Sequence, residues 1–251
     1  MKIFFDTNIL VKLLENSVEL PKQHHYLTFE KCLYEVKNGF KLKLYDSAFL
    51  NSLLQNTSTD GEMKDQDSYL KEKFLAFIEE TNYSRNEIIQ LKKAFNKYFL
   101  KFEYGIASEY EFMDLAKTDD IGLIKNLFKN LKILLRTVLS GVEERVCSYN
   151  IEQLLYEQIF DSDLSSTNFR EILDDSLINT KDLEIVFAAL KTNCKLFLSS
   201  DFPLIKETKT LGLNHTTEFV YINPDDNFEQ RLGETINTAY NSSVYKIAAG
   251  R

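Results

Sequence analysis

The 251-residue chain has no tryptophan and few residues of the kinds that break or cross-link a backbone. Three prolines and eight glycines are too few for long linkers or a turn-rich all-β protein, so long helices are expected. The cysteines are isolated and form no CxxC pair, which argues against a disulfide framework or a zinc knuckle and favours buried apolar packing. They are Cys32, Cys147 and Cys194.

Several other signals are missing. The sequence has no membrane-spanning run and no secretory signal, which predicts a soluble, cytoplasmic protein with no membrane partner. It has no glycine-rich phosphate loop, which argues against an NTPase. The net charge of −8 argues against a protein that coats nucleic acid by charge alone. It is compatible with an enzyme whose carboxylates hold cations, because bound metal offsets part of the negative charge.

Strand-like and helix-period segments alternate near both ends of the chain. Short apolar or alternating runs predict strands at residues 2–5, 41–45, 195–199 and 219–222. Apolar residues at helical spacing predict helices over 24–37 and over 181–192, the second capped by Thr180. This order predicts an α/β protein with a mainly parallel sheet.

The middle of the chain has a different pattern. Residues 61–165 carry helix-period stretches, including one at 151–160, and no β-rich run, which predicts a long all-helical insertion. The α/β core is then discontinuous, over 1–60 and 166–224, and 225–251 form a polar, helical tail.

The insertion also carries two basic rows at helical spacing, which predict ordinary solvated helix faces, with a surface that tracks a phosphate backbone as the alternative. The rows are Lys93, Lys97 and Lys101, and Lys125, Lys129, Lys132 and Arg136.

Three aspartates stand where an α/β sheet gathers its ligands. Asp6 follows the first strand, Asp201 follows the strand at 195–199, and Asp182 lies in the first turn of the helix between them. Ligands of parallel sheets bind at the carboxyl ends of strands, so we expect the three carboxylates to share one crevice if the two strands are neighbours. Their mutual repulsion makes a hard cation such as Mg²⁺ or Mn²⁺ the natural partner. Each aspartate alone is more commonly a turn former or helix cap.

The segments around these aspartates resemble the PIN-domain family of metal-dependent nucleases. Residues 4–10, Phe-Phe-Asp-Thr-Asn-Ile-Leu, look like that family's first strand and its Asp-Thr/Ser-Asn turn. Residues 182–190, Asp-Leu-Glu-Ile-Val-Phe-Ala-Ala-Leu, are similar to its Asp-x-x-Ile-x-x-Ala helix. Residues 196–202, Leu-Phe-Leu-Ser-Ser-Asp-Phe, resemble its strand ending in Thr-x-Asp. The resemblance covers about 1–56 and 170–222.

The resemblance implies a three-layer α/β/α fold and a Mg²⁺- or Mn²⁺-dependent nuclease acting on RNA rather than DNA. Asp6, Asp182 and Asp201 are then the metal ligands and catalytic residues. Thr7 or Asn8 is expected to support Asp6, with helix capping as the other role of Asn8, and Ser199 is expected to lie beside Asp201. The helical insertion is a candidate surface for a protein partner or a homo-oligomer.

The sequence departs from the family where a glutamate is expected in the helix after the second strand. Asn51 stands there, and its amide oxygen can ligate a cation but brings no charge. Asp46, Asp174 and Asp175 are candidate substitutes. If none serves, the chain is a degenerate module that binds nucleic acid or protein without cleavage. A toxin restrained by an antitoxin is a further alternative.

The three histidines have no metal-ligand spacing, and His24 and His25 are expected at the surface. A haloacid-dehalogenase-like phosphatase also begins with a strand and an aspartate. It needs a second acid two residues later, where this chain has Asn8.

Overall fold

The computed structural model describes residues 1–16, 18–45, 69–70, 72–73, 76, 121–160, 178–211, 216–225 and 227–249. It divides into two compact units, one of Met1–Val36 and Glu144–Arg251, the other of Lys37–Glu143. The boundary between them falls within two helices, α2 (Glu30–Tyr45) and α8 (Ile121–Ser148).

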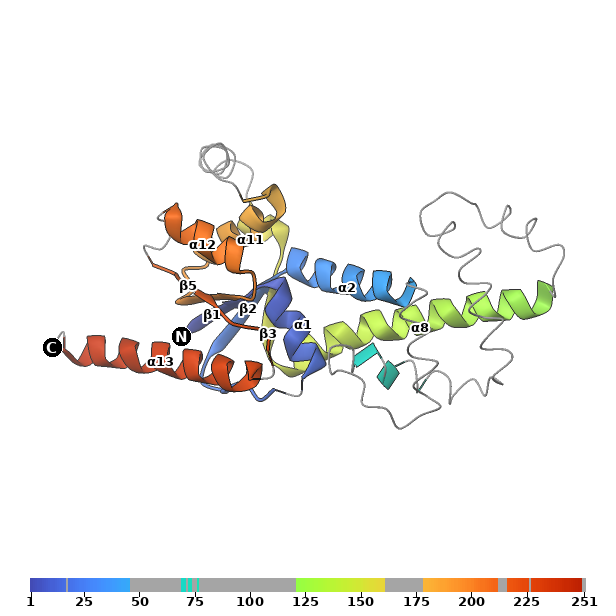
Figure 1. Cartoon of the computed structure of the whole chain (residues 1–251), viewed down its shortest axis with the longest axis horizontal. Helices are drawn as coiled ribbons and strands as arrows, with labels where there is room; N and C mark the ends of the chain where they lie inside the picture. Colours follow the sequence, from blue (N-terminus) through green and yellow to red (C-terminus); the bar gives the residue numbers. More distant parts are fainter. Residues whose placement is uncertain are drawn as a thin grey trace. The chain divides into compact units, whose positions relative to one another are not determined.

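The first unit contains a five-stranded sheet in which every pairing is parallel, so the predicted α/β class is confirmed. The order across the sheet is β3-β2-β1-β4-β5. In chain order the strands are β1 (Lys2–Phe5), β2 (His25–Phe29), β3 (Ile151–Leu154), β4 (Leu196–Ser199) and β5 (Glu218–Tyr221). Figure 1 shows α11 and α12 on one side of these strands and α13 on the other.

The central strands are β1 and β4, and almost all their side chains are buried. They pair in register from Ile3 and Leu196 to Phe5 and Leu198. The ring of Phe197 lies between those of Phe4 and Phe219, with centroids 5.7 and 5.2 Å away. Continuous apolar runs are typical of strands that are covered on both faces of a parallel sheet.

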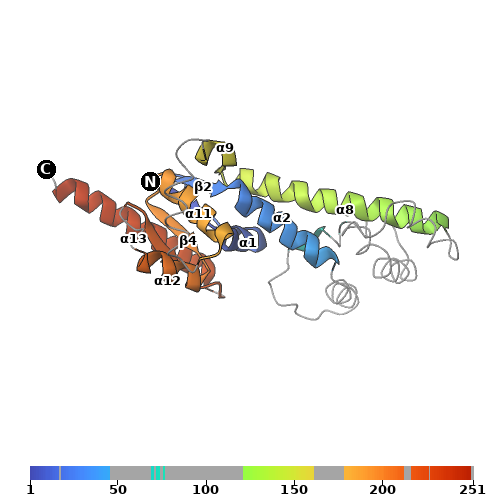
Figure 2. The same ribbon diagram turned by 90° about the horizontal axis from the view of Figure 1, so that it is seen from above.

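Three helices of this unit begin where a polar side chain accepts backbone N–H groups. Asp6 caps α1 (Thr7–Glu15), Asn179 caps α11 (Thr180–Lys191), and Asp201 caps α12 (Phe202–Thr210). The cap of α11 is therefore Asn179, and the prediction that Thr180 caps it is wrong. A short helix, α9 (Tyr156–Ile159), follows β3. The predicted C-terminal helix is α13 (Phe228–Ala249), whose end extends away from the strands in both views (Figures 1 and 2).

Two predicted elements are wrong, and both errors affect the second strand. Residues 25–29, predicted as the start of a helix, form β2, and residues 41–45, predicted as a strand, are the last turns of α2. Leu27 has the spacing of a helical stripe with Cys32, Leu33 and Val36, but it belongs to the strand. Tertiary pairing with β1 overrides that periodicity, because β2 is buried along nearly its whole length.

The expected helix at 151–160 also begins as a strand. Asn150 has a positive φ of 54°, a left-handed conformation that asparagine tolerates and that ends α8. Ile151–Leu154 then pairs with β2 as β3, and only Tyr156–Ile159 is helical.

In the second unit, the described residues are the part of α2 that begins at Lys37, the part of α8 that ends at Glu143, and a few residues between the two helices. The buried Tyr69 donates its hydroxyl to the carbonyl of Val138 at 2.7 Å and packs on Phe40 with ring centroids 5.3 Å apart. The Lys93, Lys97 and Lys101 row lies outside the described residues. In the second row Arg136 is exposed on α8.

Two predictions about exposure are wrong. Cys147 is exposed, whereas Cys32 and Cys194 are buried as expected. His24 is buried against the rings of Tyr26 and Tyr240, and only His25 lies at the surface, where it contacts Glu152 at 2.6 Å. In the part of the chain that the structure describes, no helix is long and apolar enough to cross a membrane.

Replacing Tyr149 by Phe is expected to lower the free energy of unfolding by about 1 kcal/mol. The Tyr149 hydroxyl lies 3.0 Å from the carbonyl of Leu13 and 3.3 Å from that of Asn16, at the end of α1 where helical carbonyls need donors. Urea denaturation of the variant measures the loss. Tyr34→Phe is the matched control because Tyr34 is 69% exposed. Equal stability of both variants and wild type would contradict the role given to Tyr149.

Candidate functional site

The candidate site lies at the carboxyl ends of β1 and β4. These strands are neighbours, whereas β2 and β3 continue the sheet to one side and β5 to the other. Successive connections therefore leave this point in opposite directions, and such a switch point opens a crevice outside the strand ends. Asp6 follows β1 directly and Asp201 follows β4 after Ser200. The condition that was set for bringing the aspartates together, adjacency of these two strands, is met.

Asp6 is buried, with 4% of its surface exposed, although its side chain is a carboxyl. Its Oδ1 accepts the backbone N–H of Thr7 at 2.7 Å, and its Oδ2 accepts the hydroxyl of Ser199 at 2.5 Å. Its own backbone N–H donates to the carbonyl of Leu198, which ties the end of β1 to β4. Both carboxyl oxygens are thus oriented before any ligand arrives.

Ser199 connects the first and third aspartates. While its hydroxyl donates to Asp6, its Oγ accepts the backbone N–H of Asp201 at 2.9 Å. Asp201 in turn uses Oδ1 to accept the N–H of Leu204 at 2.9 Å, which caps α12. The predicted place of Ser199 beside Asp201 is observed, and the serine also contacts Asp6.

Asp182 comes from the first turn of α11 and is half-buried. Asn179 holds it, since the Asn179 Oδ1 accepts the N–H of Asp182 at 3.0 Å and the Asn179 amide donates to its Oδ2. The helix N-terminus favours a carboxylate at this position.

A fourth acid, Glu35 of α2, belongs to the same cluster and was missed by the sequence analysis. Its Oε2 accepts the hydroxyl of Thr7 at 2.7 Å, next to Asp6. It lies close enough to raise the pKa of both Asp6 and Asp182. Glu35 is in α2, the helix that directly follows β2. The run Leu27-Thr28-Phe29 is the sequence signal that would have found it, because a strand there places Glu35 in the following helix.

The carboxylates affect one another electrostatically. Burial raises the pKa of Asp6 from its ordinary 3.8 to about 6, the hydrogen bonds from Ser199 and Thr7 oppose this, and Asp182 and Glu35 add to it. Partial burial also raises the pKa of Asp182, the Asn179 amide opposes it, and Glu35 and Asp201 add to it. Negative charge in this crevice is therefore only partly compensated by the protein.

Among the residues that the structure describes, Lys31 is a cation beside the cluster. Lys31 lowers the pKa of Asp182, but its ammonium also contacts Glu184. Because Lys31 is shared between Asp182 and Glu184, it offsets only part of the negative charge of the four acids in the cluster. A divalent cation or a proton on Asp6 would relieve the rest.

The donor set suits a hard cation, with oxygen ligands that are already oriented. Within the described residues, no three His, Cys, Asp or Glu side chains are placed to hold one ion together. Mg²⁺ needs only one or two protein carboxylates, because water and substrate phosphates complete its octahedron. One or two of these acids would therefore suffice as protein ligands of such an ion.

The other predicted site residues are placed as follows. Asn8 is exposed on the first turn of α1, and the helix cap is Asp6, so the capping role considered for Asn8 is wrong. Asn51 and its candidate substitutes Asp46, Asp174 and Asp175 lie outside the described residues. The reason for considering them was the strand at 41–45, which does not exist.

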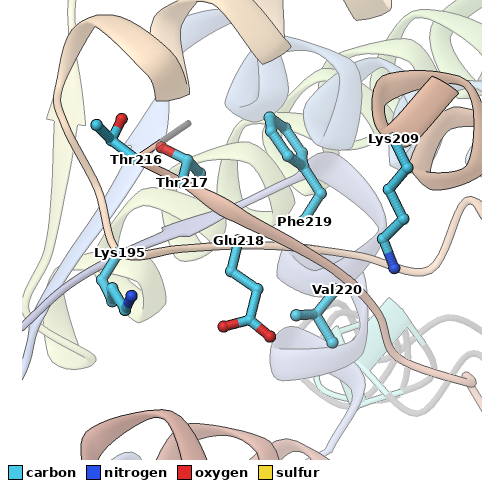
Figure 3. A pocket seen from close by; sticks show the side chains of 7 residues that line it. All are labelled: Lys195, Lys209, Thr216, Thr217, Glu218, Phe219 and Val220. Atoms are coloured by element: carbon cyan, nitrogen blue, oxygen red, sulfur yellow. The ribbon is translucent and has the colours of Figure 1, made fainter. Parts of the chain in front are cut away.

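A separate pocket of about 360 Å³ runs along the edge strand β5. In Figure 3, Glu218 lies between Lys195 and Lys209, and Thr216, Thr217, Phe219 and Val220 complete the lining. Lys195 and Thr217 precede their strands, so the pocket begins at the amino ends of β4 and β5. It shares no residue with the acidic cluster.

Comparisons with protein-family models, with curated proteins and with solved structures each found no match. The geometry of the cluster and the resemblance of its three segments are therefore the basis for a functional proposal.

The pKa of Asp6 predicts a pH-dependent stability. A carboxyl whose pKa is raised by folding binds its proton more tightly in the folded state, so its ionisation disfavours folding. In the absence of divalent metal, ionisation of Asp6 should lower the free energy of unfolding by on the order of 3 kcal/mol as the pH rises from about 4 to above 6. Asp6→Asn mimics the neutral form and should lose this dependence.

The measurement is urea denaturation from pH 4 to 7 in the presence of a chelator, read as the difference between wild type and Asp6→Asn. Glu144→Gln, at an exposed position of α8, is the matched control for removal of one charge. A difference that stays constant across this pH range would contradict the assignment of the titration to Asp6.

Proposed function

We propose that this chain is a divalent-metal-dependent hydrolase of phosphodiester bonds, with RNA as the preferred substrate. The observation that carries the proposal is the convergence of Asp6, Asp182, Asp201 and Glu35 at one switch point. Within the described residues, Lys31 offsets only part of the charge of these four acids, which supports a role in holding cations. The preference for RNA rests on the resemblance to PIN-domain nucleases alone.

The roles of the chain's own residues follow from their contacts. Asp6 is held by Thr7 and Ser199, so its carboxylate is preoriented at the carboxyl end of β1. Asp201 and Asp182 supply carboxylates from the starts of α12 and α11, and Glu35 supplies one from α2. A bound Mg²⁺ or Mn²⁺ would supply positive charge opposite the scissile phosphate and lower the pKa of a coordinated water.

Ser199 and Thr7 act as positioning residues. Each contacts an acid through a side-chain hydroxyl, Ser199 to Asp6 and Thr7 to Glu35. Ser199 also accepts the Asp201 N–H, so it sets the separation of two of the acids.

Glu35 bears on the alternative of a non-cleaving module. That alternative was motivated by Asn51 at the place of an expected glutamate. With β2 at His25–Phe29, Glu35 supplies an acid in the helix after the second strand. The acid cluster therefore has the charge that a cleaving enzyme of this type needs, and the proposal favours cleavage. The toxin alternative concerns biological context, which the site geometry does not address.

Cleavage is expected to need Asp6 and Glu35. Asp6→Asn and Glu35→Gln preserve shape and remove charge, and each should reduce the rate with Mg²⁺ or Mn²⁺ by at least about a hundredfold, because metal neutralisation of the transition state is lost. The measurement is the cleavage of a labelled single-stranded RNA on a denaturing gel, with chelator as the blank. Glu144→Gln should cleave as wild type does, and full activity of Asp6→Asn would refute the assignment.

Metal binding is expected without any nucleic acid. Titration calorimetry of Mn²⁺ into the metal-free protein at pH 7 should give saturable heat, and Asp201→Asn should weaken or abolish it. Asn is chosen because it can still cap α12 through its side-chain oxygen. Circular dichroism confirms that the variant is folded. Absence of saturable binding to wild type, with RNA present or absent, would favour the non-cleaving module.

A further inference from the structure

A pair of exposed aromatic side chains lies beside the acidic cluster. Phe202 is the first residue of α12 and is 58% exposed, and Tyr221 ends β5 and is 36% exposed. Their ring centroids are 5.5 Å apart and their planes meet at 81°. Burying a side chain of this size is normally favourable by about 1.5–3 kcal/mol, so two adjacent exposed rings mark a surface suited to a ligand.

The backbone places this pair at the carboxyl ends of the strands, where the acids also lie. Tyr221 is the register partner of Ser199, and Phe202 directly follows Asp201. The strand ends are tied by the Ser200 hydroxyl, which donates to the carbonyl of Ile222 at 2.7 Å, and by the N–H of Ile222, which donates to the carbonyl of Ser199 at 2.9 Å. Since Ser199 contacts Asp6, the pair is continuous with the cluster.

The charge of the neighbourhood limits what can bind there. Four acids influence one another at the carboxyl ends of these strands, so a polyanionic substrate gains little from the protein's own charge there. Groups that are insensitive to charge can add binding energy beyond what a bound cation would supply. Aromatic side chains provide it to unpaired bases by stacking, whatever the base, whereas bases within a duplex are not accessible for stacking.

We propose that Phe202 and Tyr221 form a stacking platform for an unpaired base of a single-stranded nucleic acid, beside the phosphate that the acids address. The platform makes the site selective for single strands over duplexes. The inference rests on the proposed function for the identity of its ligand, but its test reads binding and needs no cleavage.

The absence of tryptophan from the chain provides a direct probe. Phe202→Trp yields a protein with one tryptophan at the platform, and its fluorescence should be quenched saturably by a 12-nucleotide single-stranded RNA but not by the same RNA in a duplex. Tyr240→Trp is the matched control. Tyr240 is also a partly exposed aromatic, but its ring contacts His24, which directly precedes β2 and so lies at the amino ends of the strands. Its fluorescence should not change.

The energetic test uses leucine, which keeps apolar bulk and removes the aromatic face. Phe202→Leu and Tyr221→Leu should each raise the Kd for the fluorescein-labelled RNA by about five- to tenfold or more, measured by anisotropy with Ca²⁺ in place of Mg²⁺. Tyr240→Leu should leave the Kd unchanged. Where the enzyme cleaves, the same substitutions should raise KM more than they lower kcat.

The outcomes separate this inference from the proposed function. Quenching and weakened binding without any cleavage support the platform and count against the nuclease. Cleavage with the wild-type KM in both leucine variants overturns the platform and leaves the nuclease standing. Equal quenching by the single strand and the duplex also overturns the platform. Tryptophan fluorescence that changes with protein concentration alone overturns it as well, because the rings would then serve self-association.

Discussion

The parallel pairing of β1 with β4 is the constraint on which the site depends. It brings the carboxyl ends of two strands that are almost 200 residues apart in sequence to one point, and it buries Asp6 there. The pairing is held by a core of large side chains, Phe4 and Phe197 among them, so the position of the carboxylates follows from the most buried part of the sheet. Loops would not position four acids with this precision.

The same burial makes the site costly, and hydrogen bonds offset only part of that cost. Ser199 and Thr7 stabilise the charged form of Asp6, yet its pKa remains raised, because desolvation and the nearby acids outweigh two hydrogen bonds. Under the proposed function, a bound cation would offset this cost and raise the free energy of unfolding. Ligand affinity and fold stability would then be coupled through Asp6.

Each helix start at this edge has two roles. Asp6 and Asp201 cap α1 and α12, and Asp182 lies in the first turn of α11, so the carboxylates are positioned by the backbone that they also stabilise. The aromatic pair extends the edge toward β5 with side chains that carry no charge. Under the two proposals, the acids would address the backbone of a nucleic acid and the rings its bases.

The sequence by itself determined the alternation that gives an α/β sheet, and it placed Asp6, Asp182 and Asp201 after strands or at helix starts. These are local properties, since turn-forming residues and apolar runs act over a few positions. It misplaced the second strand, because Leu27 has the spacing of the helical stripe that follows it, and so it pointed to Asn51 instead of Glu35. Only the tertiary structure decided that His25–Phe29 pairs with β1, which places Glu35 against Thr7. Pairing between strands depends on burial over long separations, which no short stretch of sequence encodes.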